Sequence, residues 1–226
     1  MRDTERKGAV WMRSGVVWNL FLAFVPVGLG YLLAWLLSRR GKGGAMLLLA
    51  IPLAVAWLLF LPNSCYLLTE WRHLLFDRRW EDLFDHGPTD RIAMFRVAKL
   101  ALYFLLYSGT GVLLFVLAIR PVERWLRSTG QKFYFYAPFL FFLMSLGVYL
   151  GLSPRRNSWD LVQLQSVWRS TLGALTNQTL LLSIVVFAAV LWALYEAMDI
   201  WVDGIADRMP GKGGGGARKP ARAKKA

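Results

Sequence analysis

Five stretches without a charged residue, each long enough to cross a lipid bilayer, dominate this sequence. They run over 14–38, 43–69, 100–119, 133–154 and 170–195. A helix needs about 20 apolar residues to cross roughly 30 Å of hydrocarbon. Only helices and closed barrels satisfy their own backbone groups there, and these runs lack the alternation of barrel strands. The sequence therefore predicts an all-α, polytopic integral membrane protein with about five transmembrane helices plus interfacial amphipathic helices.

The membrane domain is expected over 14–203, after a short polar segment at 1–13. Removing polar ends gives predicted spans of 16–37, 45–61, 97–119, 133–152 and 180–202. The first apolar run is too long for the core of a signal peptide, so we expect it to stay as a span. The tail at 204–226 is rich in Gly, Lys, Arg and Ala and has no apolar periodicity. That composition is typical of a disordered, basic segment.

The distribution of Lys and Arg indicates how the chain is oriented. With five spans the two termini lie on opposite sides, and the basic residues are slightly more numerous in the first loop, the third loop and the tail. Because cytoplasmic segments carry the excess of Lys and Arg, we expect a multi-pass protein of the cell membrane with a cytoplasmic C-terminus. Its expected partners are membrane lipids, including anionic headgroups at the tail. No nucleic acid is expected, since the basic tail has neither an aromatic platform nor a folded reader beside it.

A polar segment, PNSCYLLTEWRHL at 62–74, follows the second apolar run. We expect Pro62 to end that span and an interfacial helix to follow. In such a helix Asn63, Tyr66, Glu70 and His73 advance by three or four residues and share one face. Glu70 and His73 have the spacing of Glu-x-x-His metal ligands. A metal site needs three or four ligands, which the sequence does not clearly supply, so no metal and no cofactor is predicted.

A second polar segment, GVYLGLSPRRNSWDL at 147–161, follows the fourth span. Asn157 is a good N-cap, and Asp160 lies three residues on, as in a capping box. The apolar residues that follow recur at helical spacing and predict an amphipathic helix in the membrane interface. Both polar segments belong to loops on the same side of the membrane. We therefore predict that they form one polar cluster, made of Asn63, Tyr66, Glu70, His73, Arg155, Asn157 and Asp160.

The two segments resemble the signatures of a prokaryotic integral-membrane family called domain of unknown function 1361. Its patterns run approximately P-N-x-P-Y-L-x-T-D-x-x-H-L and G-x-Y-L-G-R-x-x-R-W-N-S-W-D. The chain departs from them at Cys65 for Pro, Glu70 for Asp, Leu152 for Arg and Arg156 for Trp. The resemblance implies a membrane fold over about 14–203, and it implies no activity, because the family is uncharacterised.

Three functions are compatible with two polar segments on one membrane face. We favour a structural, assembly or lipid-binding component. The alternative is an enzyme acting on a lipid headgroup or a lipid-linked glycan, in which Arg155 and Arg156 hold an anion and Glu70, His73 or Asp160 transfers a proton. No nucleophile elbow, Walker loop or zinc motif supports it, so whether the chain is an enzyme stays open. A small transporter is the third possibility, although the predicted spans have no charge in their central thirds and no internal repeat.

Overall fold

The computed structural model describes residues 2–39, 44–71, 84–85, 90–152 and 164–208. All the regular structure in these ranges is helical. The α-helices are α1 (Arg2–Ser38), α2 (Gly44–Thr69), α5 (Arg91–Ser128), α6 (Ala137–Leu152), α7 (Leu164–Thr176) and α8 (Gln178–Arg208), with a 3-10 turn, η3, at Phe133–Phe135. Asp90 caps α5, since its Oδ1 accepts a hydrogen bond from the backbone N of Ile92 at 2.9 Å. Asn177 caps α8 in the same way, through the backbone N of Leu180 at 3.1 Å.

The expected membrane class is confirmed, because four helices in the described part of the chain are long and apolar enough to cross a bilayer. They are α1, α2, α5 and α8. The stretch predicted as a span at 133–152 contains η3 and the 16-residue α6. At 1.5 Å per residue α6 is about 24 Å long, which is shorter than the roughly 30 Å of a hydrocarbon core. Pro138 lies in the first turn of α6, where proline is well tolerated because the backbone N–H there has no partner within the helix.

The second helix does not end at Pro62, which corrects the expectation of a break there. α2 continues as one helix through Pro52 and Pro62 to Thr69. Proline is tolerated inside membrane helices because neighbouring groups can satisfy the carbonyl that loses its partner. Asn63 and Tyr66 therefore lie on the last turns of an apolar helix rather than on a separate interfacial one.

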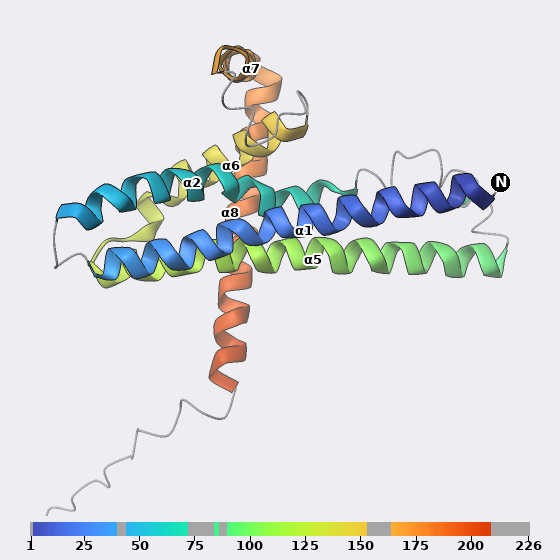
Figure 1. The fold of residues 1–226 in the computed structure, drawn as a ribbon, viewed down its shortest axis with the longest axis horizontal. Helices are drawn as coiled ribbons and strands as arrows, with labels where there is room; N and C mark the ends of the chain where they lie inside the picture. The colour runs from blue at the N-terminus through green and yellow to red at the C-terminus, as the bar shows by residue number, and fades with distance from the viewer. Residues whose placement is uncertain (1, 40–43, 72–83, 86–89, 153–163, 209–226) are drawn as a thin grey trace, which may run out of the picture.

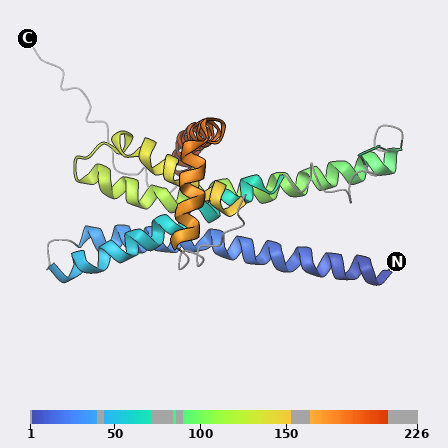
Figure 2. The same cartoon turned by 90° about the horizontal axis from the view of Figure 1, so that it is seen from above.

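The long helices do not form a simple parallel bundle. α1 packs against α2 and α5, and these three run along a common direction (Figure 1). α6 packs against α2 and α8. Figures 1 and 2 together show that α8 runs across α1, α2 and α5 instead of along them. α1, α2 and α5 can therefore lie along the same membrane normal, whereas the axis of α8 has a different direction.

Close helix contacts are made where a glycine faces a neighbouring helix. At Gly30 of α1 an added Cβ would lie 2.3 Å from the carbonyl oxygen of Ala118 on α5. The indole Nε1 of Trp57 on α2 donates a hydrogen bond to the same oxygen at 3.0 Å. Small residues allow such close packing of membrane helices. This point therefore ties α1, α2 and α5 together.

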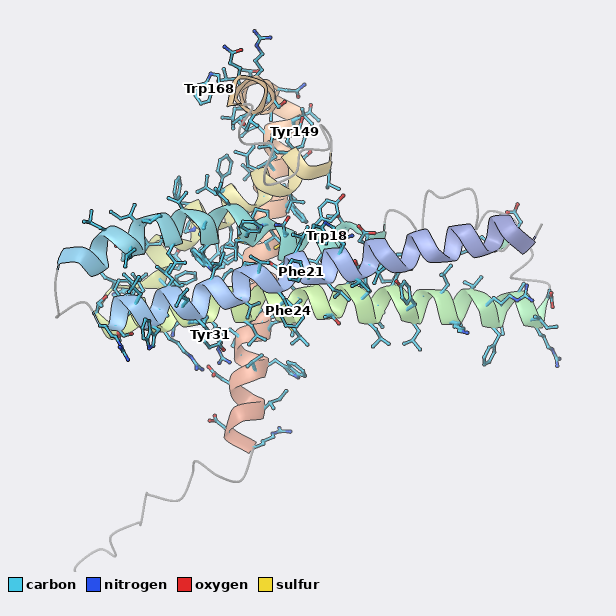
Figure 3. The ribbon with its side chains drawn as sticks, viewed as in Figure 1. Trp18, Phe21, Phe24, Tyr31, Tyr149 and Trp168 are labelled. Carbon is cyan, nitrogen blue, oxygen red and sulfur yellow. The ribbon has the colours of Figure 1, made fainter. Side chains whose placement is uncertain are left out.

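Large apolar side chains also cover the outside of the molecule. Trp18, Phe21, Phe24 and Tyr31 project from α1, and each is about half exposed or more (Figure 3). Trp168 on the amphipathic α7 is exposed as well (Figure 3). Apolar surface of this extent is costly in water but not in hydrocarbon. The outer surface thus agrees with a membrane-embedded protein.

Candidate functional site

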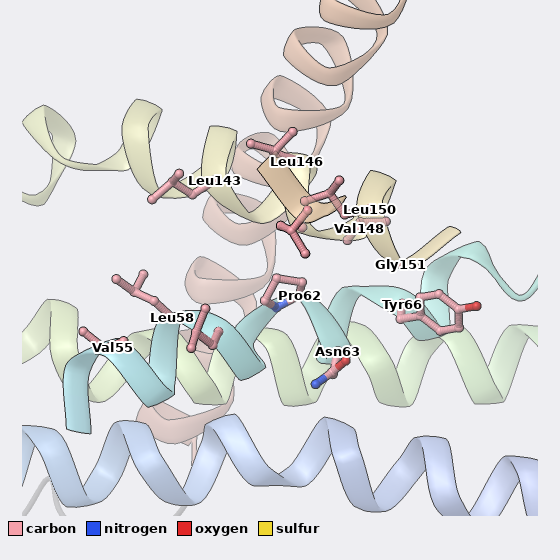
Figure 4. A pocket seen from close by; sticks show the side chains of 13 residues that line it. Val55, Leu58, Pro62, Asn63, Tyr66, Leu143, Leu146, Val148, Leu150 and Gly151 are labelled. Atoms are coloured by element: carbon pink, nitrogen blue, oxygen red, sulfur yellow. The ribbon is translucent and has the colours of Figure 1, made fainter. Parts of the chain in front are cut away.

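A cavity of about 340 Å³ lies between α2 and α6. Its walls include residues from both polar segments that the sequence singles out (Figure 4). The first segment contributes Pro62, Asn63 and Tyr66, and the second contributes Gly147, Leu150 and Gly151. The two segments therefore meet in the fold although more than 70 residues separate them in the chain.

The contact between Pro62 and Gly147 positions the two walls. A Cβ at Gly147 would lie 2.5 Å from Cγ of Pro62, so only glycine permits this approach. The cavity is found beside this contact, where the facing side chains are those of larger residues such as Val55, Leu58 and Leu143 (Figure 4). Pro62 and Gly147 thus serve as a spacer between α2 and α6.

The cavity is apolar over most of its length. Aliphatic side chains form most of the lining, and none of the lining residues that the structure describes is charged. The polar side chains in the lining are Asn63 and Tyr66, on the last turns of α2. Figure 4 shows Val55 at one end and Tyr66 at the other, with the Asn63 amide directed toward α1. An elongated molecule with an apolar body and a polar end fits this distribution.

A small polar group continues from Tyr66 toward the end of α2. Glu70 follows one turn later, and the amide Nδ2 of Asn19 on α1 donates a long hydrogen bond to its Oε1 at 3.5 Å. Next to it, the indole Nε1 of Trp71 donates to Oγ of Ser108 on α5 at 3.0 Å. Polar side chains from α1, α2 and α5 therefore meet beyond the polar end of the cavity.

The predicted seven-residue cluster is only partly described. Asn63 and Tyr66 line the cavity, and Glu70 lies beside Asn19 outside the lining. His73, Arg155, Asn157 and Asp160 fall outside the described residues. That these four join the others at one membrane face stays a prediction. Among the described residues no group of three or more His, Cys, Asp or Glu side chains is arranged to hold a metal ion.

A network of charged residues lies between α5 and α8 and was not predicted from the sequence. Arg120 is 6% exposed, and its Nε lies 2.7 Å from Oδ1 of Asp199, while its Nη2 contacts Asp203. Nη2 of Arg124 lies 3.1 Å from the same Oδ1 of Asp203. Buried charges in membrane proteins are costly and need such partners. The network joins the C-terminal parts of two apolar helices.

A carboxylate beside this network is buried more deeply. Glu123 is 2% exposed, accepts a hydrogen bond from the hydroxyl of Tyr195 and pairs with Arg127. The aromatic ring of Tyr195 lies among Phe115, Phe133 and Phe141, at centroid distances of 5.7 to 5.9 Å.

One signal in the sequence points to the network. The predicted third span ends at Ile119, which places the charged residues after it in a loop, but α5 continues to Ser128. In a continuous helix Arg120, Glu123, Arg124 and Arg127 have the spacing i, i+3, i+4, i+7 and lie on one face. Asp199 and Asp203 are likewise four residues apart on α8. The helical spacing of opposite charges near the ends of α5 and α8 is therefore a sequence signal for the two charged faces that form the network.

Comparison with known proteins identifies the family. The family model described as "Protein of unknown function (DUF1361)" matches residues 18–194. The match covers more than half of the chain, so the chain belongs to this family, as the resemblance of its two polar segments indicated. The comparisons with curated proteins and with solved structures gave no significant match.

Proposed function

We propose that this member of the DUF1361 family is a lipid-binding component of the cell membrane, and that one lipid chain occupies the cavity between α2 and α6. The observation that supports this most is the composition of the cavity. It is apolar over most of its length, and both polar segments of the sequence contribute to its walls.

The size of the cavity favours part of a lipid over a whole one. Ligand pockets typically measure about 300–1,000 Å³, and at about 340 Å³ this cavity is at the lower end of that range. A single acyl chain segment fits such a volume, with the rest of the lipid outside. The described lining residues carry no charge, which agrees with a hydrocarbon occupant.

The polar end sets the direction of the bound chain. Asn63 and Tyr66 lie at the end of the cavity that is closer to the C-terminus of α2. The apolar, membrane-spanning stretch of α2 also ends there, at Thr69. Glycerol or headgroup oxygens placed there can exchange hydrogen bonds with the phenol of Tyr66. The headgroup then lies near Glu70 and Asn19, while the acyl chain extends toward Val55.

Filling the cavity tests this proposal. Val55 is 50% exposed and lines the cavity, so Val55→Trp should fill the space without entering the packed core. Leu49 is 61% exposed on the same helix and does not line the cavity, so Leu49→Trp is the matched control. Both variants and the wild type are purified in mild detergent, and the lipid retained per protein is measured by native mass spectrometry.

We expect the wild type and Leu49→Trp to retain one lipid after extended washing. Val55→Trp should retain about tenfold less lipid, which corresponds to a loss of about 1.4 kcal/mol of binding free energy. Equal retention by the two tryptophan variants would refute the site. Failure of the wild type to retain any defined lipid would refute the function.

The same proposal includes an orientation with the C-terminus in the cytoplasm. It is supported by the excess of Lys and Arg in the first loop, the third loop and the tail. A C-terminal green fluorescent protein should be fluorescent in intact cells, and a C-terminal alkaline phosphatase should be inactive. The opposite pair of results would reverse the orientation.

A further inference from the structure

A second cavity, of about 380 Å³, lies between the C-terminal parts of α1 and α5. Its lining includes two arginines, two serines and two aromatic residues, namely Arg120, Arg124, Ser38, Ser128, Tyr31 and Trp125. It shares no lining residue with the cavity between α2 and α6. Tryptophan and tyrosine are typical of the membrane–water interface, where lipid headgroups lie.

The two arginines that line this cavity both contact one anionic oxygen of Asp203 on α8, which is not among the described lining residues. Oδ1 of Asp203 contacts Nη2 of Arg120 and lies 3.1 Å from Nη2 of Arg124. Two guanidiniums converging on one oxygen are a recurring way to bind phosphate, because arginine presents several donors in a fixed plane. The carboxylate of Asp203 thus occupies the position that an external anion would take between the two guanidiniums.

Asp203 and Asp199 differ in how firmly they are held. Asp199 is 17% exposed and pairs with Nε of Arg120. Asp203 is 54% exposed and lies on the last turns of α8, which ends at Arg208. Water can therefore compete for Asp203 more readily than for Asp199. An external anion in place of Asp203 keeps the two arginines neutralised and leaves Asp199 on Arg120.

We propose that Arg120 and Arg124 form a binding site for the phosphate group of an anionic ligand, with Asp203 as its internal competitor. Phosphate oxygens replace the Asp203 carboxylate on the two guanidiniums, and the end of α8 is released from α5. The hydroxyls of Ser38 and Ser128 donate to carbonyls of their own helices, to Ala34 and Trp125. An anionic phospholipid and a soluble phosphate ion offer the same chemistry to this site.

If Asp203 competes with the ligand, removing its charge should raise the affinity for the ligand. If its ion pairs are purely structural, removing the charge should not raise that affinity. Full-length protein in a neutral detergent is titrated with short-chain phosphatidylglycerol and, separately, with inorganic phosphate. Asp203→Asn removes the competitor and should raise the affinity for at least one of these probes about tenfold. Arg124→Gln removes a charged donor and should lower that affinity about tenfold or more.

Arg127→Gln is the matched control. It removes the same charge one turn further along α5, where Arg127 pairs with Glu123 and does not line the cavity. It should leave the affinity within about twofold of the wild type, because a surface charge outside the site contributes only long-range attraction. Asp203, Arg124 and Arg127 all have more than half of their side chains exposed. In Arg127→Gln the hydroxyl of Tyr195 remains as a donor to Glu123, and a denaturant titration of each variant checks that its stability is kept.

The outcomes decide both the site and its ligand. Tighter binding by Asp203→Asn of phosphatidylglycerol alone indicates a lipid headgroup, and tighter binding of inorganic phosphate as well indicates a soluble phosphate. Unchanged or weaker binding of both probes by Asp203→Asn would overturn the proposal. So would an equal loss of affinity in Arg127→Gln and Arg124→Gln, which would mean general attraction to a basic surface. The lipid site between α2 and α6 is not affected by any of these results, because its lining is separate.

Discussion

The hydroxyl of Tyr195 on α8 donates a hydrogen bond to the carboxylate of Glu123 on α5, and both side chains are almost completely buried. The ring of Tyr195 packs against Phe115 and Phe141, and Glu123 also pairs with Arg127 at the surface. A buried carboxylate is stable only while such donors satisfy it. This contact therefore fixes the crossing of α8 over α5.

Replacing Tyr195 by phenylalanine tests the contribution of this hydrogen bond. Tyr195→Phe keeps the ring packing and removes the donor, so Glu123 is left with Arg127. We expect a loss of about 1–3 kcal/mol of unfolding free energy, the usual cost of an unsatisfied buried polar group. Tyr136→Phe is the control, because the exposed hydroxyl of Tyr136 donates to Gln131 at 3.2 Å and should contribute little. Equal stability of the two variants in denaturant titrations would contradict the expected role of Tyr195.

The single cysteine provides a reporter for such measurements. Cys65 is fully buried on α2, so its thiol should not react with a maleimide in the folded protein. It should react within the unfolding transition, when the core opens. Lys132→Cys adds an exposed thiol after α5 and should be labelled at once, which checks that the reagent is active. Rapid labelling of wild-type protein in mild detergent would mean that α2 is not packed as described.

Alanine substitutions at two glycines of α5 are expected to change the stability of the protein in opposite directions. At Gly111 an added Cβ would lie 2.6 Å from Cβ of Leu67 and 3.1 Å from the backbone oxygen of Ser64 on α2. Gly111→Ala should therefore force α2 and α5 apart and destabilise the protein by about 1–3 kcal/mol. Gly109 has nothing within 4 Å of an added Cβ, so Gly109→Ala should stabilise α5 by about 0.5–1 kcal/mol. Unfolding monitored through Cys65 should rank the variants in this order, and similar values for both would contradict the close packing at Gly111.

The membrane class was predictable because it depends on local composition alone. Uncharged runs of about 20 residues have few alternatives to a membrane helix, whatever surrounds them. The continuation of α2 through Pro62 was not predictable in the same way. In water a proline usually ends a helix, but in a membrane protein the loss of one backbone hydrogen bond is offset by neighbouring helices. The surroundings decide which outcome applies, and the sequence of the segment does not describe them.

The candidate sites depend on contacts between distant segments, which explains why they were only partly foreseen. The two polar segments were predicted to meet because both belong to loops that are expected on the same side of the membrane. Pro62 and Gly147 lie in contact, while the seven-residue cluster itself stays a prediction. Helical spacing indicates the charged faces of α5 and α8, but the pairing of Arg120 with Asp199 and Asp203 also depends on where α8 crosses α5. Helical spacing places Asp199 and Asp203 on one face of α8, but it does not name the helix that the face meets.

Glu70 distinguishes lipid binding from chemistry on a lipid headgroup. If Glu70 only helps to hold a headgroup beside Asn19, a glutamine there still accepts a hydrogen bond and keeps the shape. We then expect Glu70→Gln to retain the same lipid species as the wild type, with an affinity lowered less than tenfold. The measurement is mass spectrometry of the lipids retained by each protein after incubation with one defined phospholipid. Appearance of an altered headgroup with the wild type but not with Glu70→Gln would contradict pure binding, because a carboxylate can take up a proton from a reacting group and an amide cannot.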